Sequence, residues 1–114
     1  MYDRLLGRAQ WHARQFLSSI DSRHIGTLVT REALSSALAG PLPQEPSDPA
    51  DVIDHLARTA DPGIVAVAGS RYFGFVTGGS HPAAVSADWL LSAWDQNAAL
   101  YVMSPAAAVI EDVA

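Results

Sequence analysis

The sequence predicts a mainly α-helical fold, and three observations indicate it. Apolar residues recur at steps of three and four over residues 2–19, which is the spacing of one face of a helix. Asp48 with Pro49, and Ser104 with Pro105, each place a hydrogen-bond acceptor directly before a proline, which is typical of a helix start. The length of 114 residues is that of one domain with a single modest core.

Two helices are predicted in the first forty residues. The first covers residues 2–19, and its apolar face is formed by Tyr2, Leu5, Leu6, Ala9, Ala13, Phe16, Leu17 and Ile20. The chain then turns over residues 21–26. Thr30 is a candidate cap for a short helix over residues 32–38, because its hydroxyl can accept a hydrogen bond from a free backbone N–H group. Gly40 and the prolines after it end that helix.

A proline-rich connector over residues 41–47 follows, and its prolines favour an extended backbone. Asp48 and the proline after it begin a third helix, which the pattern extends to about residue 60. The apolar spacing predicts its buried stripe as Val52, Ile53, Leu56 and Ala57. We therefore divide the chain into N-terminal helices at 1–40, the connector at 41–47, and a third part at 48–114.

The third part is predicted to alternate extended segments with two more helices. Residues 64–67 form a strand or an extended core segment, and residues 72–76 and 100–103 are extended, because β-branched and aromatic residues suit that backbone. Two glycines, 78 and 79, should end the second of these segments in a turn. Ser80 and Pro82 open a fourth helix, and Ser104 caps a fifth.

Charge and composition exclude several classes of function. Seven basic against twelve acidic side chains give a net charge of −5 without a basic cluster, so nucleic acid is not an expected partner. The absence of cysteine excludes disulfides, thiolate nucleophiles and cysteine metal sites, and a cytoplasmic location fits this composition. No apolar run approaches the about 20 residues of a membrane span, and the N-terminus lacks the apolar core of a secretory signal.

Four motifs could carry chemistry, and each has a plainer interpretation. GGSHP resembles the G-x-S-x-G turn of serine hydrolases, but Pro82 replaces the last glycine, so Ser80 is better explained as a helix cap. The four histidines lack metal-ligand spacing, and we expect them to face solvent. RYFGF could stack on RNA bases, but core packing suits so acidic a chain better. Asp88 and Asp95 share one helix face, as paired carboxylates or, more simply, a solvated or dimer-facing stripe.

Residues 82–114 are unusually apolar. They include two tryptophans and only four charged side chains, all acidic: Asp88, Asp95, Glu111 and Asp112. Helices that are apolar on most faces are usually buried on several sides, and the preceding part of the chain offers too few helical faces to cover them. We therefore expect the chain to be a piece of a larger protein.

The part of the chain from Arg71 to Ala114 also carries a family pattern. It reads RYFGFVTGGSHPAAVSADWLLSAWDQNAALYVMSPAAAVIEDVA. This string resembles the N-terminal region of group II pyridoxal-phosphate-dependent decarboxylases, the family of the glutamate, aromatic amino acid, histidine and diaminobutyrate enzymes. The similarity is strongest in RYF with the following TG, in ADWL, at Asn97 and in SPA. The long first helix, the proline-rich connector and the DPADVI helix start also fit, so the resemblance covers essentially the whole chain.

The resemblance implies both a fold and an activity. The fold is the type I pyridoxal-phosphate architecture, a large α/β domain assembled as an intertwined homodimer, of which this chain would be the N-terminal helical segment. The activity is that of a carboxy-lyase that decarboxylates an amino acid with pyridoxal phosphate as cofactor. The residues implied to contact the substrate are Phe75, Val76, Thr77, Gly78 and Asn97.

Phe75 stands where glutamate-specific enzymes have a polar amide, so the resemblance fits an apolar or aromatic substrate better than a dicarboxylic one. Each of these residues also has a plainer interpretation. Phe75 could pack in the core, and Thr77 and Asn97 could satisfy backbone groups in a turn and at a helix end.

Every basic residue is arginine, and the chain contains no lysine. The family mechanism needs a lysine ε-amine to hold the cofactor as a Schiff base, an acidic partner for the pyridine nitrogen and a ring stacked on the pyridine. In the family these groups follow the segment that this chain matches. We therefore expect the chain by itself to be inactive, with no catalytic or cofactor-binding residue. The alternative is a stand-alone remnant that dimerises or binds a partner without catalysis.

Overall fold

A computed structural model describes all residues from Met1 to Ala114. It contains α-helices, one short 3-10 helix over Asp61–Gly63 and no strand, which confirms the prediction of a mainly α-helical chain. The chain forms two compact units, Met1–Gly79 and Ser80–Ala114. The predicted divisions at residues 40 and 47 follow the secondary structure and remain predictions.

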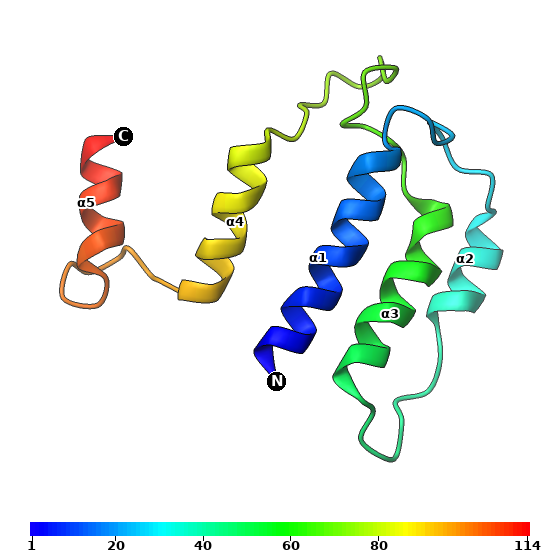
Figure 1. Ribbon diagram of the computed structural model, residues 1–114, viewed down its shortest axis with the longest axis horizontal. Coiled ribbons are helices and arrows are strands. Elements are labelled where there is room, and N and C mark those ends of the chain that lie inside the picture. The colour runs from blue at the N-terminus through cyan, green and yellow to red at the C-terminus, as the bar shows by residue number, and fades with distance from the viewer. The chain divides into compact units, whose positions relative to one another are not determined.

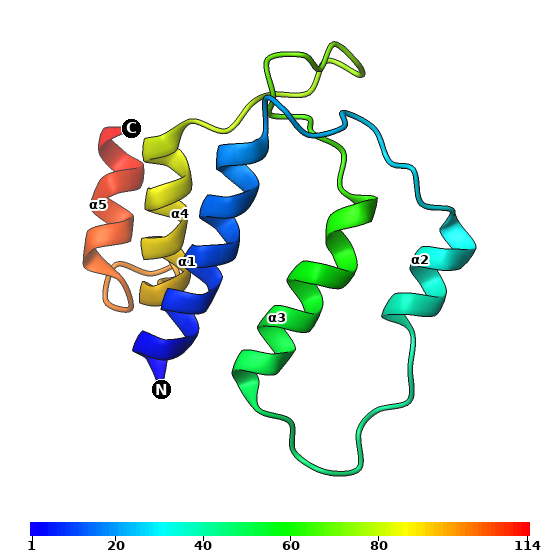
Figure 2. The ribbon, with the colours of Figure 1, turned by 45° about the vertical axis from the view of Figure 1, so that its right-hand side comes forward.

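Three helices build the first unit (Figure 1). They are α1 at Tyr2–Ser19, α2 at Arg31–Leu38 and α3 at Pro49–Ala60, close to the predicted bounds. Helix α3 packs against both of the others and lies between them, as Figures 1 and 2 both show. Helices α1 and α3 lie side by side and run in the same direction, with their N-termini at the same end. Helix α2, which precedes α3 in the chain, runs in the opposite direction.

Local capping sets where α2 and α3 begin. The Thr30 hydroxyl accepts a hydrogen bond from the Ala33 N–H group at 3.1 Å. The Asp48 carboxylate accepts one from the Ala50 N–H group at 2.8 Å. Both caps were predicted from the sequence and are confirmed, because capping depends only on residues within one helical turn.

The loops at the C-terminal ends of α1 and α3 are tied to each other. The Ala66 N–H group donates to the Ile25 carbonyl at 2.8 Å, and the Ser70 hydroxyl donates to Asp21 at 2.8 Å. The Arg71 guanidinium donates to the carbonyl of Arg23 at 2.6 Å. Ala66 is the one buried apolar residue of the chain, at 1% exposure, so this junction is held mainly by hydrogen bonds.

The predicted buried stripe of α3 is wrong in part. Val52 and Leu56 are exposed, and Ile53 and Ala57 are only partly buried. The most buried residue of α3 is Asp54, at 7% exposure. The four apolar residues do share one face of α3, but α1 contacts a neighbouring face, which carries the Asp54 carboxylate.

The second unit consists of two helices that run in opposite directions, α4 at Pro82–Trp94 and α5 at Pro105–Val113. Helix α4 is capped by His81 and not by Ser80 as predicted, because the imidazole Nδ1 accepts the Ala83 N–H group at 3.3 Å. Ser104 occupies the N-cap position of α5 as predicted, but its side chain makes no capping hydrogen bond. The Ser104 side chain is buried and its hydroxyl donates to the Gln96 amide oxygen at 2.6 Å instead.

None of the three segments predicted to be extended is a strand. Residues 64–66 have no regular structure, and the buried Ala66 favours the extended core interpretation. Residues 72–76 and 100–103 contain turns, with the Met103 N–H group donating to the Leu100 carbonyl at 3.0 Å. A strand needs a neighbouring strand to satisfy its backbone groups, and without one the backbone bonds locally.

Replacing the cap of α2 should destabilise that helix. We expect Thr30→Ala to lower the free energy of unfolding by about 1 kcal/mol, since it removes the acceptor for a free N–H group. Urea unfolding followed by circular dichroism measures the effect. Ser36→Ala is the matched control, because Ser36 is exposed on the same helix and makes no hydrogen bond. Equal midpoints for the two variants would contradict the assignment.

Candidate functional site

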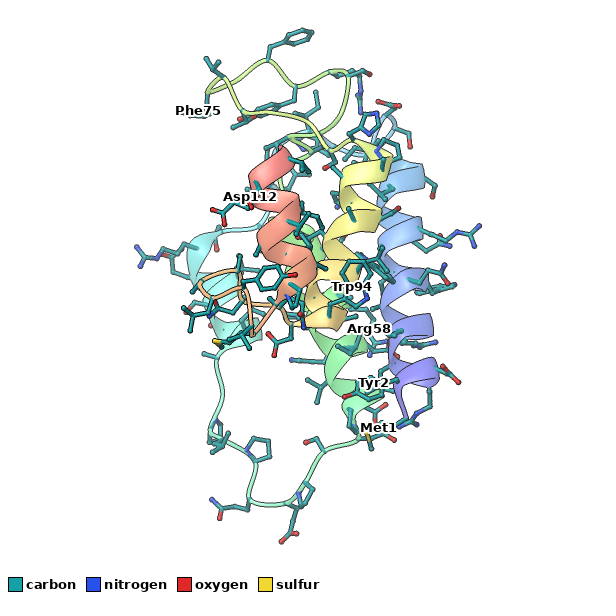
Figure 3. The ribbon with its side chains drawn as sticks, turned by 90° about the vertical axis from the view of Figure 1, so that its left-hand side faces the viewer. Met1, Tyr2, Arg58, Phe75, Trp94 and Asp112 are labelled. Carbon is teal, nitrogen blue, oxygen red and sulfur yellow. The ribbon has the colours of Figure 1, made fainter.

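Four of the five residues implied to contact substrate lie together on the exposed loop after residue 71. Phe75 is 93% exposed, Val76 is fully exposed, and Thr77 and Gly78 are exposed as well. Figure 3 shows Phe75 on this loop, beyond the ends of the first unit's helices. The plainer interpretation of RYFGF as core packing is wrong in this structure, because both phenylalanines of the stretch are 93% exposed.

The backbone of this loop turns at Phe75 and Val76, although neither residue type favours the positive φ of this turn. Phe75 has a φ of 55° and Val76 a φ of 51°, in the left-handed region. That region is costly for a β-branched residue such as valine, because its Cβ substituents crowd the backbone. The predicted turn at Gly78 and Gly79 is wrong, since residues 77–81 contain no turn and the chain turns earlier, at Phe75 and Val76.

Asn97 belongs to the second unit, in the segment that joins α4 to α5. Its side-chain oxygen accepts a hydrogen bond from the Ala99 N–H group at 2.9 Å. This is the plainer role that the sequence left open, in which the amide satisfies a backbone group. The assignment of Asn97 and of the loop residues to substrate binding remains a prediction.

A polar cluster of Arg8, His12 and Asp54 joins α1 to α3. Arg8 donates two hydrogen bonds to the Asp54 carboxylate, and the His12 Nε2 atom lies 2.7 Å from the same carboxylate. The His12 side chain is only 17% exposed, so the expectation that all histidines face solvent is wrong for His12. The Trp11 ring meets the His12 ring edge to face, with centroids 4.7 Å apart.

The cluster holds Asp54 in its charged form. Hydrogen bonds first from Arg8 and then from His12 keep the pKa of Asp54 well below its usual range, although partial burial opposes this. The same pairing raises the pKa of Arg8. Because Asp54 stays ionised, His12 must donate its Nε2–H to it.

Two further ion pairs repeat along the same helix pair. The Nη1 and Nη2 atoms of Arg4 donate hydrogen bonds to the Asp48 carboxylate at 3.1 and 2.8 Å. Arg23 donates to the Asp61 carboxylate at 2.8 Å. Basic groups of α1 and its following turn thus meet acidic groups of α3 in the same chain order. This order fits the parallel arrangement of the two helices and sets their register.

An open groove of about 800 Å³ lies on one side of α1 and α3. Its apolar walls include Trp11, Phe16 and Ile64, and its charged walls include Arg23 and Arg58. The Arg23 guanidinium lies over the Phe16 ring at 4.6 Å, a cation–π distance. The Arg58 side chain is 67% exposed, makes no hydrogen bond and lies 3.7 Å from Asp54, whose oxygens are already occupied by Arg8 and His12.

The apolar surface of the chain is largely uncovered. The total solvent-accessible area of the chain, polar and apolar together, is 9212 Å². A folded chain of this mass exposes about 6,000 Å², and two independent folded units of these lengths about 7,000 Å² together. The exposed large apolar side chains of the second unit are Trp89, Leu90, Leu91, Trp94, Leu100, Tyr101, Val102, Met103, Val109, Ile110 and Val113.

Neither a metal site nor a serine nucleophile is assembled in this structure. No three His, Asp or Glu side chains lie close enough to hold a metal ion. Ser80 makes no hydrogen bond to a histidine or an acid, so the hydrolase alternative has no geometric support. The sequence reasoning missed the Asp54 cluster, although Arg4, Arg8 and His12 recur at four-residue steps on one helix face and signal a polar contact.

No family model, curated protein or solved structure matches this chain. No helix has both the length and the apolar character that crossing a membrane requires.

Removing the Asp54 carboxylate should weaken the contact between α1 and α3. We expect Asp54→Asn to lower the urea midpoint of the first unit, because Arg8 and His12 lose their shared acceptor. Asp51→Asn is the matched control, since Asp51 is exposed on the same helix and forms no ion pair. If both variants unfold at the same urea concentration, the cluster does not hold the helices together.

Stability should fall in acid. The pKa values of Asp21, Asp48 and Asp54 are lowered by Ser70, Arg4 and Arg8 respectively, so the folded chain binds fewer protons than the unfolded chain. Their contribution is present above the ordinary carboxyl pKa of about 3.9 and is lost as the pH falls below it, through the lowered values. Urea midpoints measured against pH should drop in that range, and less steeply in Asp54→Asn.

Proposed function

We propose that this chain is the N-terminal segment of a cytoplasmic pyridoxal-phosphate-dependent amino acid decarboxylase, a homodimer of the type I α/β fold. Its helices would cover the catalytic body, and the Phe75 loop would border the substrate. The observation that carries the proposal is the lack of a core, since Ala66 is the one buried apolar residue. The family resemblance of residues 71–114 names the body that would cover this surface.

The energetics of folding support the proposal that another part of the protein buries the exposed apolar side chains. Fixing each residue costs about 1–2 kcal/mol of backbone entropy, and burial of apolar surface is the main term that offsets it. Residues such as Trp94, Leu91 and Val113 contribute little free energy of apolar burial while they stay exposed. A surface with many exposed large apolar side chains is typical of a protein interface.

The chain by itself does not fit the cofactor. It contains no lysine that could hold pyridoxal phosphate covalently, and no resemblance assigns a pyridine-binding residue to it. In the proposed protein the cofactor supplies the electron sink for loss of carbon dioxide. The residues of this chain would exclude water from the site and shape its mouth.

A partner-binding remnant without catalysis is the second candidate. The open groove favours it, because the exposed guanidinium of Arg58 lies beside the aromatic walls Trp11 and Phe16. Arg58 makes no hydrogen bond, and its ion pair with Asp54 is long, at 3.7 Å. A partner with a carboxylate on an apolar helix would complement such a groove in charge and in shape. This candidate requires no cofactor and no further domain.

The proposed activity is tested on the reading frame that follows the Ala114 codon. We expect it to encode a Ser-x-Lys or His-x-Lys motif, and its full product to release carbon dioxide from an apolar or aromatic amino acid. The 114-residue chain treated with pyridoxal phosphate and borohydride should carry no adduct except on its N-terminal amine, as read by mass spectrometry. A stoichiometric adduct elsewhere would contradict the proposal.

The state of the isolated chain separates the two candidates. The decarboxylase segment should bind a hydrophobic dye and aggregate as its concentration rises. A remnant should form a soluble, monodisperse dimer or complex with cooperative unfolding. In that case Arg58→Glu should weaken the association several-fold, and Arg31→Glu, an equal charge change on a helix outside the groove, should not.

A further inference from the structure

We propose that His81 is a pH-dependent cap of α4, so that protonation of its imidazole releases the first turn of the helix. The His81 Nδ1 atom accepts the Ala83 N–H group at 3.3 Å, which requires a lone pair on that nitrogen. A protonated imidazole has hydrogen on both nitrogens and cannot accept this bond. The helix start therefore depends on the neutral ring.

The charge of the protonated ring acts in the same direction. The N-terminus of a helix carries a partial positive charge, so a cation there is unfavourable. The first turn of α4 contains no acidic residue that could offset it. The ring of His81 is exposed and takes part in no ion pair or other hydrogen bond, and the nearest charged residue along the helix is Asp88, well beyond the first turn.

The other side-chain caps of the chain lack this sensitivity. The Thr30 hydroxyl does not ionise, and the Asp48 carboxylate has a lowered pKa, so both stay acceptors near neutral pH. Imidazole is the side chain that changes charge between about pH 5 and 8. The GGSHP motif thus gives α4 a start that responds to mild acid, at the boundary between the two compact units.

Protonation should lengthen the irregular segment between the units. The residues from Thr77 to His81 have no helical structure, and loss of the cap adds the first turn of α4 to them. A Ser, Thr, Asp or Asn cap favours the helical first turn over the frayed one by about fivefold, and we take this value as the size expected for the imidazole cap. This inference is independent of the proposed function.

The test follows the amide of Ala83 in ¹H–¹⁵N NMR spectra of the full chain, at a concentration below the onset of its aggregation, between about pH 5 and 8. We expect its chemical shift to change in step with the His81 ring resonances, and its exchange protection to fall about fivefold on the acid side. The amides of Ala33 and Ala50 report the Thr30 and Asp48 caps in the same sample and should not follow His81.

Two variants complete the test. His81→Asn keeps an acceptor that does not titrate, so its Ala83 amide should stay protected across the range. His81→Ala should show the frayed amide at every pH. The proposal is overturned if the Ala83 amide of the unaltered chain ignores the His81 titration, or if His81→Asn shows the same pH dependence.

Discussion

The first unit depends on one carboxylate, Asp54, which lies between two parallel helices. A buried charge is costly unless it is paired and hydrogen-bonded, and Asp54 meets that condition through Arg8 and His12 of α1. Such contacts are directional, so they fix the register of α1 against α3 in a way that apolar contact alone does not. The pairs at Arg4 and Arg23 extend the same register toward both ends of the helices.

This arrangement specifies a geometry but supplies little of the free energy that apolar burial gives to a domain. Exposed ion pairs contribute little to stability, and the chain buries one apolar residue, Ala66. Ion pairs therefore hold α1 against α3, and side-chain caps set the starts of α2 and α3, while many large apolar side chains stay exposed. That combination is expected of a segment whose cover comes from another part of a protein, which is the basis of the function that we propose.

Local features of this chain were predictable from its sequence, and contacts between distant residues were not. The starts of α2 and α3 were predictable, because Thr30 and Asp48 act within one turn of the chain. The Asp54 cluster was not, since it joins residues more than forty positions apart, and the apolar spacing of α3 pointed to a different face. The extended predictions for residues 72–76 and 100–103 were wrong, because β-propensity expresses itself only beside a pairing strand.

In the loop at Phe75, the local preference of the sequence and the observed backbone disagree. Its aromatic and β-branched residues favour an extended backbone, yet Phe75 and Val76 adopt left-handed turns with their side chains in solvent. A sequence whose local preference opposes its structure is expected at functional sites or where an interaction partner is missing. The resemblance assigns substrate contact to the same four residues from Phe75 to Gly78. A covering body would account for the exposed rings and the left-handed backbone, because it would bury the rings and offer the backbone a partner in its preferred extended form.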